Sequence, residues 1–369
     1  MHVGIDARLN AYRDGGIAEY TRRIAGALAA LPSPHTYTLI QHRRARHSGG
    51  MALPAGTRTA YAFTPPHHAL ESITFGAEIA PLRLDVLHSP DFIPPRFGAR
   101  RYVITVHDLT FLLYPETQTP DATRYYAGQI RRAVQQAAHI LTDAHATKAD
   151  LIRLLGVPPE KVSVHHLGVD EAFRPLPPES VQPFLAARAL PAGYLLFVGT
   201  FEPRKNLRGL ISAYAALRAQ LPDCPPLVIA GRRGWLYEPL FEQATALNLG
   251  KSLIWVENLP TAEMPALYNG AAVLVLPSFY EGFGFPALEA MACGVPTVVS
   301  ERGSLPEVVG ETGLYCDPDS PDSITAALAR ALTDSTFRAE SRAAGLTRAA
   351  GFTWRSAAES VLAAYTALA

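Results

Sequence analysis

The chain has 369 residues, enough for two domains of ordinary size. It is 48% hydrophobic and carries 33 basic and 33 acidic side chains, so its formal net charge is zero. A balanced charge gives no general attraction to nucleic acid, and we expect no nucleic-acid partner. The three cysteines, Cys224, Cys293 and Cys316, are too widely spaced for a disulfide framework or a structural zinc site.

The first residues lack the basic segment and apolar run that mark a signal peptide. No apolar run reaches the roughly 18–20 residues that a membrane span requires. We therefore expect a cytoplasmic protein. The sequence does not decide whether the protein also makes peripheral contact with the inner face of the membrane.

Short apolar runs alternate with helical patterns along the chain. In the first half, strands are predicted at residues 3–5, 37–40, 86–87 and 102–106. Between the first two, one helical stripe is formed by Ile17, Tyr20, Ile24, Leu28 and Leu31. In the second half, strands are predicted at residues 194–198, 227–230, 253–256, 273–276 and 297–300. This alternation is typical of buried parallel sheets with crossover helices.

The boundary between two domains is predicted from a proline cluster. Pro175, Pro177 and Pro178 stand within four residues, which stiffens the chain and excludes a helix. We place a linker at residues 173–184, after an N-terminal domain at 1–172 and before a C-terminal domain at 185–352. Residues 353–369 have one apolar face, and we expect a helix that packs back on the first domain.

The strongest motif lies at residues 277–296, between a predicted strand and a predicted helix. Gly282 and Gly284 allow a ligand to approach the backbone, and Pro286 suits the first turn of a helix. Amides at a helix start attract phosphate or sugar oxygens. Glu281 and Glu289 flank this amide cluster and could accept hydrogen bonds from two sets of hydroxyls. Taken alone, they could equally cap and decorate the helix.

This segment resembles the Glu-x7-Glu motif of the retaining GT-B-fold glycosyltransferases, the glycosyl transferases group 1 (family four of the retaining enzymes). Nearly every position of the motif is met, and the resemblance spans nearly the whole chain, more strongly in the second half. It implies an α/β fold of the GT-B type, with two Rossmann-like parallel-sheet domains that face a cleft. It also implies hexosyl transfer from a nucleotide-diphosphate sugar with retention, without a metal and without a cofactor.

The resemblance assigns donor contacts in the C-terminal domain. Glu281 would bind sugar hydroxyls and Glu289 the ribose, while the diphosphate would rest on backbone amides near Gly282, Phe283 and Gly284. Arg204 and Lys205, in the loop at residues 199–206, would hold the diphosphate and stabilise the charge that develops on the leaving group. The alternative for this basic pair is a solvated turn. Some relatives carry an arginine where this chain has Thr200, which departs from the pattern.

The N-terminal domain contributes a second set of residues. Gly15 and Gly16 would bring backbone amides to the diphosphate, although such a pair also suits an ordinary turn. His107 would lie beside the transferred sugar as a neutral imidazole, and His107, Glu281, Arg204 and Lys205 form the expected catalytic set. His88 is expected to line the acceptor side. His165 and His166 lack a third ligand at a suitable spacing, so no metal site is predicted.

The sequence indicates the identities of the donor and the acceptor less clearly than it indicates the family. Residues 231–237 and 281–294 are similar to bacterial mannosyltransferases of polysaccharide assembly, which implies GDP-mannose as the donor and a saccharide or lipid-linked saccharide as the acceptor. Residues 257–260 depart from the family's turn near the base and leave the base open. A nucleotide-sugar epimerase, a phosphorylase and a non-catalytic nucleotide-sugar-binding protein remain alternatives. An NAD-dependent oxidoreductase lacks its dinucleotide fingerprint here.

Overall fold

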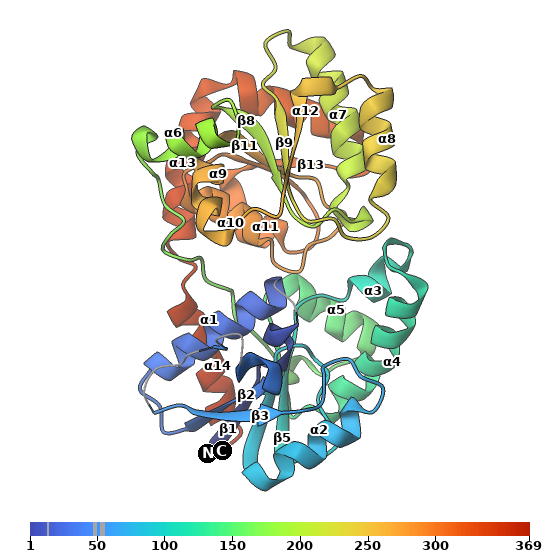
Figure 1. Cartoon of the computed structure of the whole chain (residues 1–369), viewed down its shortest axis with the longest axis vertical. Helices are drawn as coiled ribbons and strands as arrows, with labels where there is room; N and C mark the ends of the chain where they lie inside the picture. The colour runs from blue at the N-terminus through green and yellow to red at the C-terminus, as the bar shows by residue number, and fades with distance from the viewer. Residues whose placement is uncertain (13–14, 47–49, 52–55) are drawn as a thin grey trace. The chain divides into compact units, whose positions relative to one another are not determined.

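The structure is a computed structural model that describes residues 1–12, 15–46, 50–51 and 56–369. It divides into two compact units (Figure 1). The first unit consists of Met1–Leu113, Pro120–Gly168 and Thr353–Ala369. The second consists of Tyr114–Thr119 and Val169–Phe352. No helix within the described ranges combines the length and the apolar character needed to cross a membrane.

The first unit is built on a seven-stranded parallel sheet of order β3-β2-β1-β4-β5-β6-β7. Its strands are β1 (His2–Asp6), β2 (Thr36–His42), β3 (Arg58–Ala62), β4 (Leu84–Ser89), β5 (Ala99–Val106), β6 (His139–Thr142) and β7 (Val162–Val164). Its main helices are α1 (Gly16–Ala30), α2 (Glu71–Ile79), α3 (Thr110–Leu113), α4 (Pro120–Gln136), α5 (His145–Leu155) and α14 (Trp354–Thr366).

The second unit is built on a six-stranded parallel sheet of order β10-β9-β8-β11-β12-β13. Its strands are β8 (Tyr194–Val198), β9 (Leu227–Gly231), β10 (Leu253–Glu257), β11 (Ala271–Leu276), β12 (Thr297–Ser300) and β13 (Leu314–Cys316). Its helices are α6 (Pro178–Ala187), α7 (Leu207–Gln220), α8 (Glu238–Ala246), α9 (Met264–Asn269), α10 (Phe285–Ala292), α11 (Leu305–Val309), α12 (Pro321–Thr333) and α13 (Ser335–Ala349).

The two parallel sheets confirm the predicted Rossmann-like architecture. Every strand predicted from an apolar run is present, because such runs are buried on both faces of the sheet. The sequence analysis did not predict four strands: β3, β7 and β13, which lie at sheet edges, and the short β6, which lies between β5 and β7. Edge strands need fewer apolar residues, and β3 begins with two exposed residues.

The structure of the proline-rich segment differs from the predicted linker without a helix. Helix α6 begins at Pro178, within the range expected to be a linker, and continues through Pro183. Proline is tolerated at the first position of a helix because the amide it lacks has no partner there. The chain instead passes from the first unit to the second between Gly168 and Val169.

Each sheet has one point where the strand order reverses, between β1 and β4 in the first unit and between β8 and β11 in the second. Chain segments leave the carboxyl ends of these neighbouring strands toward opposite sides, which opens a crevice where α/β proteins bind ligands. The functional residues are therefore sought in the loops that follow β1 and β4, and in those that follow β8 and β11.

Candidate functional site

Hydrogen bonds join two loops of the second unit at the point where the strand order reverses, between β8 and β11. Asn206 adopts a left-handed backbone conformation (φ 56°), caps α7 and donates through Nδ2 to the carbonyl of Pro277 at 3.0 Å. The amide of Phe279 donates to the carbonyl of Arg204 at 2.9 Å. These bonds hold the loop after β8 against the loop after β11, so residues far apart in sequence meet at one place.

Lys205 and Glu281 form a buried ion pair at this junction. Lys205 Nζ lies 2.7 Å from Oε1 and 2.8 Å from Oε2 of Glu281, and Ser278 Oγ donates to Oε1 at 2.7 Å. Burial by itself raises the pKa of Glu281, but the charges of Lys205 and Arg204 outweigh it and lower that pKa to about 2. Glu281 is therefore an ionised carboxylate in a site that water barely reaches, with 5% of the residue exposed.

Arg204 completes a charge-balanced cluster. Its Nη1 lies 3.1 Å from Glu281 Oε2 and donates to the carbonyl of Tyr280 at 2.7 Å, while its Nη2 lies 2.7 Å from Glu202 Oε1. Two cations thus face two carboxylates. The guanidinium and ammonium groups are held in place before any ligand arrives, which is the arrangement that suits recognition of an anion.

The glycine-rich loop ends at the start of α10. Gly284 has φ +100°, a conformation that side chains rarely adopt, and a Cβ there would lie 2.7 Å from Leu305 Cδ2. Ser304 Oγ donates to the carbonyls of Glu281 at 3.0 Å and Phe283 at 2.7 Å. With its carbonyls bound, the loop from Gly282 to Gly284 is fixed at the positive end of the helix dipole.

Glu289 lies on α10 and is half-buried. The hydroxyl of Tyr268 donates to its Oε2 at 2.6 Å. Burial and the adjacent carboxylate both raise the pKa of Tyr268 well above its usual value, so this hydroxyl stays a donor. One oxygen of Glu289 is therefore oriented by a tyrosine, an arrangement that prepares the carboxylate to accept further hydrogen bonds.

The first unit places Gly15 and Gly16 at the start of α1. Both are exposed, and a Cβ added at either one meets nothing within 4 Å. Gly15 has an extended backbone (φ 164°) that any residue adopts. Neither packing nor backbone geometry within the unit therefore requires glycine at these positions, and a ligand's close approach is a physical reason for it.

His107 follows β5 and lies between two hydrogen-bond acceptors. Its Nδ1 lies 2.6 Å from Asp143 Oδ2, and its Nε2 lies 3.0 Å from the carbonyl of Pro90. Burial lowers the pKa of His107, but the charge and hydrogen bond of Asp143 prevail and raise it, a shift that favours the protonated ring over the neutral imidazole expected from the sequence. Through these contacts His107 positions the loop after β4.

The expectation that His88 lines the acceptor side is wrong. His88 is fully buried, with Nδ1 2.7 Å from the Tyr365 hydroxyl and Nε2 2.8 Å from Thr105 Oγ1. The Thr105 hydroxyl is 3.0 Å from that of Tyr20, which lies 2.9 Å from His165 Nε2. This buried polar network joins β4, β5 and α14 and serves the structure of the unit.

Sequence analysis missed Glu202, Ser278 and Asp143. Glu202 and Ser278 stand in the two motif segments, two residues before Arg204 and three before Glu281. A polar residue so close to a motif is a signal that could have found them. Asp143 stands in no such segment, and only the pairing of β5 with β6 brings it to His107.

Two family models match the chain. The model of glycosyl transferases group 1 matches residues 187–348, and the model of glycosyltransferase family 4 matches residues 14–173. Together they cover the loops of both units that carry the residues described above.

Curated relatives include two mannosyltransferases of Escherichia coli. The chain is 37% identical over 287 residues to O-antigen chain mannosyltransferase B, covering 77% of this chain and 74% of that protein. It is 31% identical over 272 residues to the serotype-specific mannosyltransferase WbdA, covering 72% of this chain but only 33% of that longer protein.

The fold matches solved structures along its whole length. The sucrose-phosphate synthase of Thermosynechococcus elongatus superposes with a TM-score of 0.81 at 21% identity, covering 100% of this chain and 98% of that one. At this level of identity the likeness shows a shared GT-B architecture.

Proposed function

Because the chain belongs to the glycosyl transferases group 1, we propose that it transfers mannose from GDP-mannose to a saccharide or lipid-linked saccharide, with retention and without a metal ion. Glycosyltransferase activity follows from the family. The choice of mannose is supported by the 37% identity to O-antigen chain mannosyltransferase B.

The observation that carries the proposal is the buried Lys205–Glu281 pair beside Arg204. When the donor's diphosphate binds Arg204 and Lys205, it takes hydrogen bonds that Glu281 holds in the free protein. The carboxylate of Glu281 then becomes available to the sugar hydroxyls. Glu289 would accept hydrogen bonds from the ribose.

Bond breaking leaves negative charge on the departing diphosphate. Two fixed cations and the amides near Gly282, Phe283 and Gly284 stabilise that charge in a site of low dielectric. Amides at Gly15 and Gly16 would add to it from the start of α1. These groups provide the electrostatic stabilisation that a divalent cation supplies in metal-dependent transferases.

Retention follows from attack on the same face that the diphosphate leaves. In our mechanism Glu281 binds the sugar hydroxyls and does not act as a covalent nucleophile. In our mechanism the departing phosphate oxygen accepts the acceptor's hydroxyl proton as the new glycosidic bond forms. In the same mechanism His107, held by Asp143 and by the Pro90 carbonyl, positions the loop after β4 rather than acting as a base.

The first test is thermal unfolding in EDTA against GDP, GDP-mannose, UDP, UDP-glucose and ADP. A ligand of the native state at a hundred times its Kd stabilises by about 2.7 kcal/mol and raises the midpoint. We expect this with GDP and GDP-mannose, and a loss of the shift in Lys205→Ala but not in the exposed-lysine control Lys251→Ala.

Stabilisation by UDP or ADP compounds alone would overturn the assignment of the donor. A shift that requires divalent metal would overturn metal independence. Retention is tested separately by the anomeric NMR signal of the disaccharide product, where a β-linked mannoside from the α-linked donor would contradict it.

A further inference from the structure

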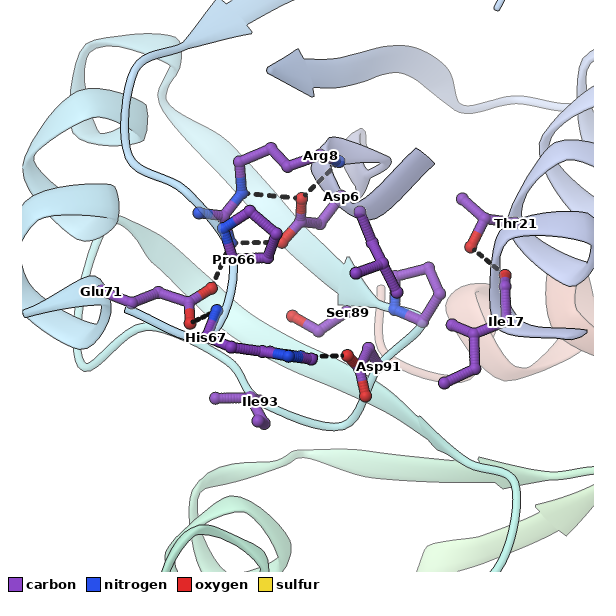
Figure 2. Close-up of a pocket in the computed structure, with 12 residues that line it drawn as sticks. Asp6, Arg8, Ile17, Thr21, Pro66, His67, Glu71, Ser89, Asp91 and Ile93 are labelled. Atoms are coloured by element: carbon purple, nitrogen blue, oxygen red, sulfur yellow. Dashed lines mark hydrogen bonds and ion pairs between the residues drawn. The ribbon is translucent and has the colours of Figure 1, made fainter. Parts of the chain in front are cut away.

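The two units each contain a cavity, and the two cavities differ in size. In the first unit, a pocket at the reversal between β1 and β4 has a volume of about 20 Å³, which is room for a single water molecule. Figure 2 shows its polar side chains bonded to one another, with Arg8 paired to both Asp6 and Glu71. In the second unit, a cavity of about 630 Å³ is within the range of small-molecule sites. The second cavity has the room for a ligand.

The cavity of the second unit lies at the amino edge of its sheet. It is lined by residues at or just before the starts of β8, β11 and β12, and by helices α6 and α13 (Figure 1). The donor cluster of Lys205 and Glu281 instead follows the carboxyl ends of β8 and β11. The five residues of β8 separate the two edges by about 16 Å. The cavity is therefore distinct from the proposed donor site.

Small residues leave this space open. Glycine or alanine stands at each lining position around the starts of β8 and β11: Ala192, Gly193, Gly270, Ala271 and Ala272. A Cβ on Gly270 would lie 2.7 Å from the Tyr194 hydroxyl oxygen, so a larger residue does not fit there. Buried apolar side chains form the floor, with Val181, Leu185 and Val295 at 5%, 3% and 5% exposed. Such a floor favours contact with an apolar group.

The polar groups of the cavity are predominantly cationic. Among the described residues that line it there are two arginines and no acidic residue. Arg338 is committed to the protein, because its Nη1 donates to the carbonyls of Leu332 and, at 3.2 Å, of Ala331. Arg342 lies one turn further along α13 and is exposed. The cavity therefore has an apolar floor and a rim of positive charge.

The guanidinium of Arg342 is available to a ligand. In the part of the chain that the structure describes, nothing pairs with this side chain or accepts a hydrogen bond from it. The side chain passes over Gly294, where a Cβ would lie 3.4 Å from both Cγ and Nε of Arg342. A guanidinium presents its N–H donors in a planar fork that matches the oxygens of a carboxylate or phosphate.

The surface around the cavity favours a soluble ligand over a membrane. In the second unit, the exposed large apolar residues within the described ranges are Leu236, Leu247 and Tyr315, and none of them lines the cavity. Peripheral insertion into a membrane uses large apolar side chains that point outward. The apolar surface here is instead recessed below the arginines.

An apolar floor beneath an available guanidinium fits a ligand with an apolar body and one anionic group. We propose that this cavity binds a soluble amphipathic anion, whose carboxylate or phosphate binds Arg342 and whose apolar body covers Val181, Leu185 and Val295. This second site goes beyond the proposed function and does not depend on which donor the protein uses.

Octanoate tests the proposal, with 1-octanol as the uncharged probe of similar shape. Ligand-observed NMR titrations at neutral pH measure the affinity of both probes. We expect the wild type to bind octanoate about fivefold more tightly than 1-octanol, the size of effect of one partly exposed ion pair. In Arg342→Gln, octanoate should weaken to the level of 1-octanol. The control is Arg218→Gln, at an exposed arginine of α7 that does not line the cavity, and it should keep the preference.

Ala339→Trp tests the location. Ala339 lines the cavity from an exposed position of α13, so an indole there occupies the space without disturbing the core. Both probes should weaken at least about fivefold. The midpoint of thermal unfolding without probe should match the wild type in this variant and in Arg342→Gln, which establishes that both are folded. Saturating GDP should not displace octanoate, because the donor cluster lies at the opposite edge of the sheet.

The results separate this site from the proposed function. Equal affinity of the wild type for the two probes, or a preference that persists in Arg342→Gln, would overturn the anionic part of the proposal. Unchanged binding in Ala339→Trp, absence of octanoate binding to the wild type, or displacement by GDP would overturn the site. Octanoate binding through Arg342 in a protein that binds neither GDP nor GDP-mannose would support the site and overturn the proposed function.

Discussion

At the scale of single residues, the donor cluster shows how burial changes the value of charge. Lys205 and Glu281 are 8% and 5% exposed, so each depends on the other for the solvation that water no longer provides. A pair of this kind contributes little net stability against apolar residues, but it becomes costly when one partner is removed. Its retention in this chain is consistent with a role in binding an anion.

Replacement of Lys205 by methionine tests this coupling. Lys205→Met keeps the side-chain length but leaves a buried carboxylate with Arg204 as its remaining cation, so we expect a loss of about 3–5 kcal/mol in the free energy of unfolding of the second unit. The double variant Lys205→Met/Glu281→Gln should recover most of this lost free energy of unfolding. Urea unfolding measures the stability of both variants, with Lys251→Met, at an exposed lysine, as the control. A loss below about 1 kcal/mol in the single variant would contradict the coupling.

The buried histidines predict a pH dependence of stability. Burial, then the nearby charges of His165 and His107, lowers the pKa of His88 to about 3 from 6.5. Between about pH 6.5 and 5 the unfolded chain takes up a proton at this position and the folded chain does not, so the stability falls as pH falls. The slope is about 1.4 kcal/mol per pH unit for one histidine.

His88→Gln should remove that part of the slope, since glutamine does not titrate. Urea unfolding of the wild type and the variant between pH 5 and 6.5 measures the difference, with His68→Gln, at an exposed histidine, as the control. Equal slopes in the wild type and His88→Gln would be inconsistent with a neutral buried His88. His107 has the opposite sign: its raised pKa stabilises at low pH and is lost as pH rises through it.

At the scale of elements, two glycines illustrate different constraints. Gly231, the last residue of β9, has no room for a side chain, because a Cβ would lie 1.8 Å from the Gly199 carbonyl oxygen. Gly16, the first residue of α1, has open space around it. Close packing therefore requires a glycine at position 231. Packing within the first unit does not require a glycine at position 16.

Gly16→Ala separates stability from function at the start of α1. Alanine lowers the entropy of the unfolded chain and favours the helix. We therefore expect the free energy of unfolding to stay the same or to rise by up to about 1 kcal/mol. GDP affinity should nevertheless fall about tenfold if the donor's diphosphate approaches this backbone closely. Gly26→Ala, at an open position inside the same helix, is the control. Unchanged GDP affinity in Gly16→Ala would remove α1 from the donor site.

At the scale of the whole molecule, two of the points where the chain crosses between its units are neighbours: residues 168–169 and residues 352–353. The Val169 amide donates to the Phe352 carbonyl at 3.1 Å in the second unit. In the first unit a Cβ on Gly168 would lie 2.1 Å from the Trp354 amide nitrogen. The last helix, α14, therefore completes the first unit, burying residues that include Val361 and Tyr365.

Tyr365→Phe tests the contribution of that helix. The variant keeps the ring but leaves Nδ1 of buried His88 without its hydroxyl, so we expect a loss of about 1–3 kcal/mol. Deletion of residues 353–369 should be more severe and leave the first unit unfolded, because its core loses a covering helix. Urea unfolding and limited proteolysis follow both, with exposed Tyr315→Phe as the control. A deletion variant whose first unit resists proteolysis would contradict this dependence.

Much of the fold could be predicted from the sequence, because its signals are local. Continuous apolar runs at residues 194–198 and 297–300 predict buried strands with the bounds found for β8 and β12. The motif around Glu281 identified the family, since its glycines and carboxylates are spaced by the geometry of a strand, loop and helix. The polar edge strand β3 and the helix that begins at Pro178 were missed, because their local signals are weak or misleading.

Tertiary structure alone decided which side chains meet and in which charge state. Glu281 lies 76 residues after Lys205, and they pair because β8 and β11 are neighbours in one sheet. Burial lowers the pKa of His88, whereas contact with Asp143 raises that of His107 against burial, and no spacing in the sequence reveals either shift. Ser89 ends an ordinary apolar strand in the sequence, and folding buries its hydroxyl without a hydrogen-bond partner in the part of the chain that the structure describes. Composition and spacing determine the elements, whereas desolvation and contact between distant segments exist only after the chain has folded.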